Sequence, residues 1–103
     1  HDGELDHEHD DFDSFVIDLP AVADPEALAA RIAETAAAEN VLRIKGFVEV
    51  SAKPMRLQVQ AVGSRVNHYY DRPWAAGEQR RSRLVIIGEK GINREKIEQM
   101  LAA

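Results

Sequence analysis

Cysteine is absent from this sequence, which excludes disulfide bonds and thiolate chemistry and is consistent with a reducing cytoplasm. The sequence also lacks a long hydrophobic run, because no apolar stretch approaches the ~18 residues of a membrane-spanning helix. No segment combines a basic start, an apolar stretch and a small-residue cleavage site, so no signal peptide is visible. We therefore expect a cytoplasmic protein with no membrane partner.

The common catalytic motifs are missing as well. The sequence has no G-x-x-x-x-G-K-[ST] phosphate loop, and the GEKG stretch at 88–91 has the wrong spacing for one. It also has no G-x-S-x-G, H-E-x-x-H or C-x-x-C. His68, beside Tyr69, Tyr70 and Asp71, offers a small polar site, although a partly exposed strand histidine is the simpler interpretation. We therefore expect no enzymatic activity, no catalytic residues and no cofactor site in this chain.

Basic residues are missing from the first 18 positions, which carry eight acids, whereas the remaining residues carry a net charge of +3. Residues 1–11 contain one large apolar side chain, Leu5, so they cannot bury enough surface to offset the entropy of ordering. We predict that residues 1–11 are a disordered, acidic, histidine-containing linker. Residues 12–103 have the length of one ordinary domain.

The acidic segment also contains candidate metal ligands. His7 and His9 are separated by one residue, so an extended chain places both imidazoles on the same side. Asp6 and Asp10 add carboxylates, and imidazole with carboxylate suits cobalt, zinc and nickel. The sequence therefore predicts a weak Co, Zn or Ni site, because the metal must order the segment that binds it. A solvated linker that binds no metal is the alternative.

Alternating hydrophobicity predicts strands at 12–19, 41–50 and 55–62, and the near-continuous apolar run RLVIIG at 83–88 predicts a central strand. Residues 64–71 form a short extension or an extra strand, and 71–79 a loop. In the second strand, the alternation directs Leu42 inward with Ile44, Val48 and Val50. Gly46 in its middle indicates a bulge or a close backbone approach.

Two helices complete the predicted fold. Asp24-Pro25-Glu26 is typical of a helix start, with the helix reaching about Ala38, and Asn93 caps a second helix. The order β-α-β-β-β-α, with the first two strands running parallel around a crossover helix, predicts an α+β fold. It is a single open, mostly antiparallel sheet of four or five strands with two helices packed on one face. The other face carries Arg43, Lys45, Phe47 and Arg56, which we predict to be an interaction face.

Three stretches, in order and at this spacing, carry a family resemblance: LRIKGF (42–47), HYYDRPW (68–74) and RLVIIG (83–88). With the acidic lead-in before FDSFVIDLP, the sequence resembles the C-terminal domain of CobW-family P-loop GTPase metal chaperones, and the DRPW stretch resembles the cobalamin-synthesis branch. The resemblance covers essentially the whole chain. It implies an accessory domain of a larger protein that delivers a metal, cobalt for this branch. The family's phosphate loop and cysteine metal motif have no counterpart among these residues.

The implied role is partner docking or regulation, combined with a weak metal-binding tail. The expected partners are the upstream GTPase domain of the same chain, a metal-acceptor protein or a second copy. A generic protein–protein interaction module with no metal role is the first alternative. A single-stranded nucleic-acid binder is the weaker alternative: Arg80, Arg81 and Arg83 follow the aromatic residues, but the positive excess is small and the acidic tail would compete.

Overall fold

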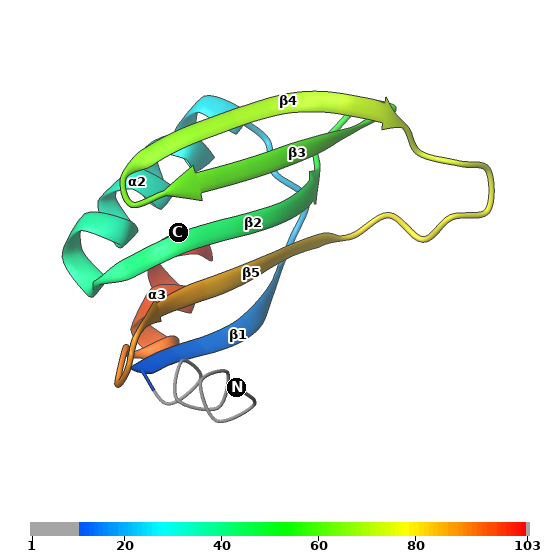
Figure 1. The fold of residues 1–103 in the computed structure, drawn as a ribbon. Helices are drawn as coiled ribbons and strands as arrows, with labels where there is room; N and C mark the ends of the chain where they lie inside the picture. The colour runs from blue at the N-terminus through cyan, green and yellow to red at the C-terminus, as the bar shows by residue number, and fades with distance from the viewer. Residues whose placement is uncertain (1–10, 103) are drawn as a thin grey trace, which may run out of the picture.

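The computed structural model describes residues 11–102, which form a five-stranded sheet and two helices (Figure 1). In chain order the elements are β1 (Phe12–Leu19), α2 (Pro25–Glu39), β2 (Val41–Glu49), β3 (Met55–Val62), β4 (Arg65–Pro73), β5 (Ser82–Glu89) and α3 (Arg94–Ala102). The predicted α+β class is confirmed. The extra strand exists as the nine-residue β4, so the loop that was predicted from residue 71 begins only after Pro73.

The strands lie in the order β1-β5-β2-β3-β4, and every neighbouring pair is antiparallel. β5 is central, as its apolar run predicted. The first two strands do run in the same direction, but β5 lies between them and pairs with both. The last strand of the chain therefore joins the β1 edge to the β2-β3-β4 meander.

Both helices begin where their capping residues predicted. The Asp24 side chain accepts a hydrogen bond from the Glu26 amide at 3.0 Å, with Pro25 at the first turn, and α2 ends at Asn40 in the left-handed conformation (φ 59°). Asn93 Oδ1 accepts from the Lys96 amide at 3.0 Å at the start of α3. Within residues 11–102, neither helix is long and apolar enough to cross a membrane.

Both helices cover the same face of the sheet (Figure 1). The core lies between them and the strands. Apart from Thr35 of α2, its largest fully buried side chains are aliphatic: Ile17, Leu28, Ile32, Ile44, Val48, Leu57, Val59, Leu84, Ile86, Ile97 and Leu101. No helix within residues 11–102 covers the opposite face, which we call the open face. The core is therefore formed by the side chains on one side of each strand. The side chains on the other side form the open face, which other molecules or other parts of the protein can contact.

The second strand departs from simple alternation at its start. Its register with β5 shifts between Val41 and Arg43, so Leu42 is an additional residue in a bulge. Val41 is buried instead, and the predicted inward position of Leu42 is wrong, since that side chain is 37% exposed. Gly46 marks a close approach, because a Cβ there would lie 2.0 Å from the Arg83 carbonyl oxygen.

Candidate docking face

The open face consists of side chains that the strand register places side by side. Residues paired across antiparallel strands point to the same side of a sheet, so the register identifies three rows. These rows are Ser14–Ile87–Arg43–Val62–Arg65, Val16–Val85–Lys45–Gln60–Asn67 and Asp18–Arg83–Phe47–Gln58–Tyr69. Arg43, Lys45 and Phe47 of the predicted interaction face therefore lie on this one surface, along the middle strand.

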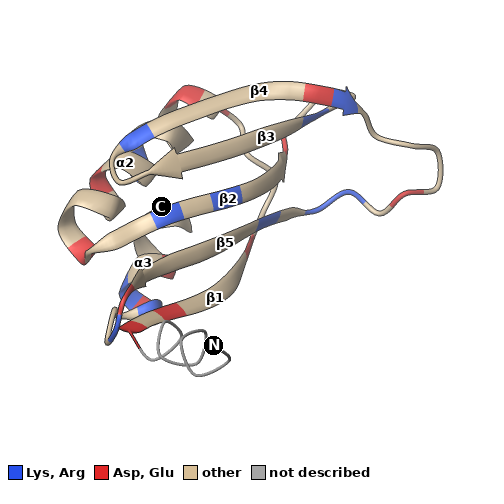
Figure 2. Cartoon of the chain, viewed as in Figure 1, with Lys and Arg blue, Asp and Glu red and all other residues tan. Residues whose placement is uncertain are grey.

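A shallow groove of about 450 Å³ runs over the centre of this face. Its apolar part comes from Phe47, Val85 and Ile87, with Gly46 beneath, and Arg43, Lys45 and Gln58 supply the polar part. Figure 2 shows the two basic positions of β2 in the middle of the sheet. We call this surface the cationic groove. Val85 and Ile87 were not predicted as groove residues, although the alternation Arg83, Val85, Ile87 in a central strand indicates that these side chains share one face.

The positive charge of the cationic groove is not neutralised locally. Among residues 11–102, the side chains of Arg43 and Lys45 have no hydrogen-bond or ion-pair partner. Arg83, in the next row, differs because its Nε lies 2.9 Å from Asp18 Oδ1, and this hydrogen bond lowers the pKa of the Asp18 carboxyl. The two cations of β2 are thus available to an external anionic partner.

Arg56 is on the same face but is already engaged. Its Nε donates to Asp71 Oδ1 at 3.1 Å, its Nη2 contacts the other carboxylate oxygen, and Gln58 Nε2 donates to that oxygen at 3.3 Å. The bond from Arg56 holds the pKa of Asp71 below its ordinary value. The guanidinium carbon also lies 4.8 Å from the centre of the Phe47 ring. Arg56 therefore positions Phe47 and is less available to a partner than Arg43 or Lys45.

The loop after β4 supports Phe47 from another side. Trp74 is only 7% exposed and meets Phe47 edge-to-face, with ring centres 6.1 Å apart at 71°. Arg72 holds the loop by two hydrogen bonds to the Glu78 carboxylate, at 2.9 and 2.8 Å, and Glu78 also accepts from the Ala75 amide at 2.8 Å. The Arg72 hydrogen bonds, followed by that amide, lower the pKa of Glu78 to about 2. Within the described part of the chain, the buried Trp74 Nε1 has no hydrogen-bond partner.

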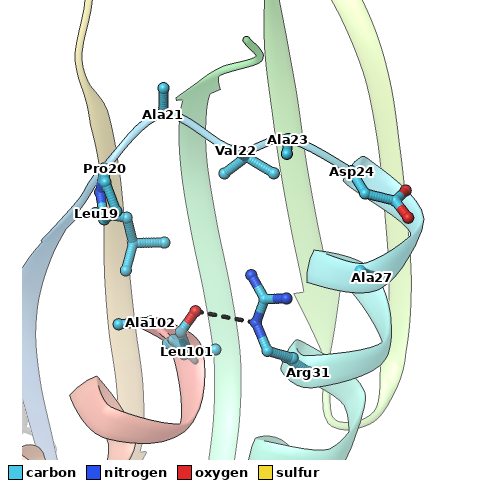
Figure 3. A pocket seen from close by; sticks show the side chains of 10 residues that line it. All are labelled: Leu19, Pro20, Ala21, Val22, Ala23, Asp24, Ala27, Arg31, Leu101 and Ala102. Atoms are coloured by element: carbon cyan, nitrogen blue, oxygen red, sulfur yellow. Dashed lines mark hydrogen bonds between the residues drawn. The ribbon is translucent and has the colours of Figure 1, made fainter.

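A second hollow, of about 310 Å³, lies beside the start of α2 and the end of α3 (Figure 3). Small side chains line most of it, including Pro20, Ala21, Ala23 and Ala27. Its basic group is Arg31, whose Nε donates to the Leu101 carbonyl oxygen at 3.1 Å and so caps the end of α3. This accounts for Arg31 as a structural residue that links the two helices.

The predicted metal ligands His7, His9, Asp6 and Asp10 lie outside the described residues, so the metal site stays a prediction. Within residues 11–102, no three His, Cys, Asp or Glu side chains are grouped closely enough to hold a metal ion.

His68 and Asp71 do not form a common polar site. His68 pairs in register with the buried Val59 and faces α2, where its Nε2 lies 3.4 Å from Glu26 Oε2. Asp71 is occupied on the open face by Arg56. Tyr69 and Tyr70 also project from opposite sides of β4, so they do not form one aromatic platform.

The comparisons with known proteins all point in one direction. A family model described as "Cobalamin synthesis protein cobW C-terminal domain" matches residues 12–103. A Sinorhizobium protein named "Zinc chaperone CobW" is 53% identical over 88 residues, which cover 85% of this chain and 25% of the relative. A Pseudomonas aeruginosa protein of the same name is 49% identical over 77 residues, 75% of this chain and 20% of the relative. The chain thus spans a quarter or less of these curated relatives.

Two solved structures have the same fold. The Zn(II)-bound YjiA GTPase from E. coli matches with a TM-score of 0.70 and 25% identity, over 94% of this chain and 30% of YjiA. A Zn(II)-bound triple mutant of YjiA GTPase matches with a TM-score of 0.70 and 27% identity, over 90% of this chain and 30% of the mutant. In both cases the match takes up less than a third of the solved chain.

Proposed function

The chain belongs to the family of CobW C-terminal domains, and from this premise we propose that it is a non-catalytic docking domain of a CobW-type, GTP-dependent metal chaperone. In this proposal the GTPase domain lies upstream in the same protein and performs the nucleotide chemistry in the cytoplasm. The support is twofold. The chain corresponds to about a quarter of the relatives' length, and it contains no phosphate loop.

The observation that carries the docking role is the cationic groove. The groove has an apolar floor of Phe47, Val85 and Ile87, next to Arg43 and Lys45, whose side chains have no partner within residues 11–102. This is the composition of a contact surface, in which apolar anchors lie beside charges that orient a partner. The favoured occupant is the GTPase domain of the same protein. A metal-acceptor protein and a second copy of the chain are the other candidates.

We propose zinc as the delivered metal. Both curated relatives are named zinc chaperones, and both YjiA structures are Zn(II)-bound. Cobalt delivery for cobalamin synthesis, which the sequence resemblance implied, stays a prediction. Transfer assays that offer Zn²⁺ and Co²⁺ side by side to the complete protein distinguish the two metals.

The docking role is tested by reversing the groove charges in the complete protein. Arg43→Glu with Lys45→Glu should change the rate of GTP hydrolysis about fivefold or more, because coupling between domains is commonly of this size. The matched control is Lys53→Glu with Arg80→Glu, at the far end of the sheet, where Arg80 Nη1 donates a hydrogen bond to the backbone carbonyl oxygen of Lys53 at 3.4 Å. If the groove variant folds normally and hydrolyses GTP at the control's rate, the docking role is wrong.

A further inference from the structure

We propose that the acidic segment at the start of the chain, residues 1–10, occupies the cationic groove and shields it until a partner displaces the segment. The proposal rests on the proposed function in one respect, since it takes the groove as the docking surface. It adds a regulatory occupant from the chain itself.

Charge complementarity is the first support. The acids of this segment occupy every second position, as Asp2, Glu4, Asp6, Glu8 and Asp10, and the segment contains no lysine or arginine. Alternate residues of an extended chain point to the same side, so one side of such a chain would present only carboxylates. The cationic groove offers Arg43 and Lys45, which are partner-free within residues 11–102, and Arg65 lies in the same row as Arg43.

The position of the attachment point is the second support. The segment precedes β1, which lies two strands from β2, and Val16, Val85 and Lys45 are neighbours in one row. Two steps between strands amount to about 10 Å. Ten extended residues span up to about 33 Å, so the segment can reach both cations. Tethering of this kind gives a local concentration in the millimolar range, which populates contacts that would be weak between separate molecules.

The cations near the attachment point favour the groove as the binding site over the helix side. Arg94 bonds to Glu98 and to the Val16 carbonyl oxygen, and Lys96 pairs with Glu39 at 3.2 Å. These two cations already have partners, whereas the side chains of Arg43 and Lys45 on the sheet, and of the exposed Lys90 in the turn after β5, have none in the described part of the chain. The groove is therefore the surface near β1 where uncompensated positive charge and exposed apolar surface coincide.

The contact should be electrostatic and reversible. Leu5 alternates with the acids and so points away from the groove when the carboxylates face it. Exposed ion pairs are individually weak, and the screening length falls from about 10 Å at 0.1 M salt to about 3 Å at 1 M. A partner that buries Phe47, Val85 and Ile87 would thus displace the acidic segment, whereas a weaker, nonspecific protein would not.

A spin-label measurement on the 103-residue chain tests the contact. Because the chain has no cysteine, Gly3→Cys provides a unique labelling site in the segment. At low ionic strength, a nitroxide there should broaden the amide signals of Lys45 and Val85 more than that of Lys53 at the far end of the sheet. Raising the salt to ~0.5 M should remove the difference.

Three variants of the labelled chain identify the charges responsible. Neutralising the five acids as Asn or Gln, or the groove by Arg43→Gln with Lys45→Gln, should weaken docking about tenfold. The control, Lys53→Gln with Arg80→Gln, should leave it unchanged. If the unsubstituted chain shows no broadening at low salt, or if the groove variant retains it, the inference is wrong. That result would leave the docking role open, because the docking role is tested separately by the GTP-hydrolysis rate of the complete protein.

Discussion

The two faces of this sheet are made by the same five strands and differ almost completely in composition. The helix-covered face buries mainly aliphatic side chains, with Thr35 and Ser82 as buried polar residues, whereas the open face mixes ion pairs, half-exposed apolar residues and cations whose side chains have no partner within residues 11–102. Ile86 and Ile87 are neighbours of identical chemistry, yet Ile86 is 0% exposed in the core and Ile87 lines the groove. Alternation therefore sorts the side chains into two sets, and the position of the helices determines which set becomes the core.

The largest expected effect is a loss of unfolding free energy when Ile86 is truncated, and the matched truncation of Ile87 should have a smaller effect. Ile86→Ala removes core volume in the central strand and should cost about 2–5 kcal/mol of unfolding free energy. Ile87→Ala leaves the core intact and should cost less than about 1.5 kcal/mol. Denaturant unfolding followed by circular dichroism measures both variants. Equal losses would mean that the open face is covered as completely as the helix side.

The fold was largely predictable because period-two alternation, helix caps and the apolar run of β5 are local signals. The bulge at Leu42 was not predictable, because it depends on the pairing of β2 with β5 and not on either sequence alone. The full length of β4 was also missed. Its polar, weakly alternating residues become a strand through pairing with β3.

The candidate site was predictable in part. Alternation placed Arg43, Lys45 and Phe47 together, and the sheet confirms that they share a face. Two features required three-dimensional information. Asp71 is an additional residue in β4, which brings it to Arg56, and the order of the strands brings Val85 and Ile87 beside β2. The charges of the groove and Phe47 of its apolar floor were therefore predicted from the sequence, while the contribution of Val85 and Ile87 depends on the strand order.

A smaller expected effect is a change in Trp74 fluorescence at acid pH, when the loop after β4 loses the contact between Arg72 and Glu78. The pKa of Glu78 is lowered to about 2, so its bonds to Arg72 stabilise the folded loop above the ordinary carboxyl value of 4.5. That stabilisation is lost as the pH falls from 4.5 toward 2, because the protonated carboxyl no longer pairs with the guanidinium. Trp74 is the single tryptophan, so its fluorescence should report the loosened contact with Phe47.

Two variants distinguish the protonation of Glu78 from the protonation of other carboxyl groups on the open face. Glu78→Gln cannot titrate and should abolish the fluorescence change that Glu78 causes. Asp71 also has a lowered pKa, because of Arg56, and Asp71→Asn removes that contribution. The far-UV circular dichroism of the whole domain should change little between pH 4.5 and 2, because the helices and strands stay folded. An acid transition that is identical in wild type and Glu78→Gln would show that the Arg72–Glu78 pair does not hold the loop.

The smallest effect on the folded domain should come from metal binding to the acidic segment. Zn²⁺ or Co²⁺ at His7 and His9, assisted by Asp6 or Asp10, would draw carboxylates away from the cationic groove. The amide signals of Lys45 and Val85 should then shift on titration, while those of Ile44 and Ile86 in the core stay unchanged. Binding should weaken below pH ~6.5, because only neutral imidazole coordinates a metal.

The double variant His7→Ala/His9→Ala is the decisive comparison for this metal site. The N-terminal amine is acetylated so that it cannot form a separate chelate with His1. The variant should lose both the metal response and the shift of the groove signals, because the two histidines carry the binding. If the strongest perturbation falls at His68, or survives the double substitution, the segment is not a metal site. Shifts of equal size on the two faces of the sheet would instead mean that the metal acts on the folded domain itself.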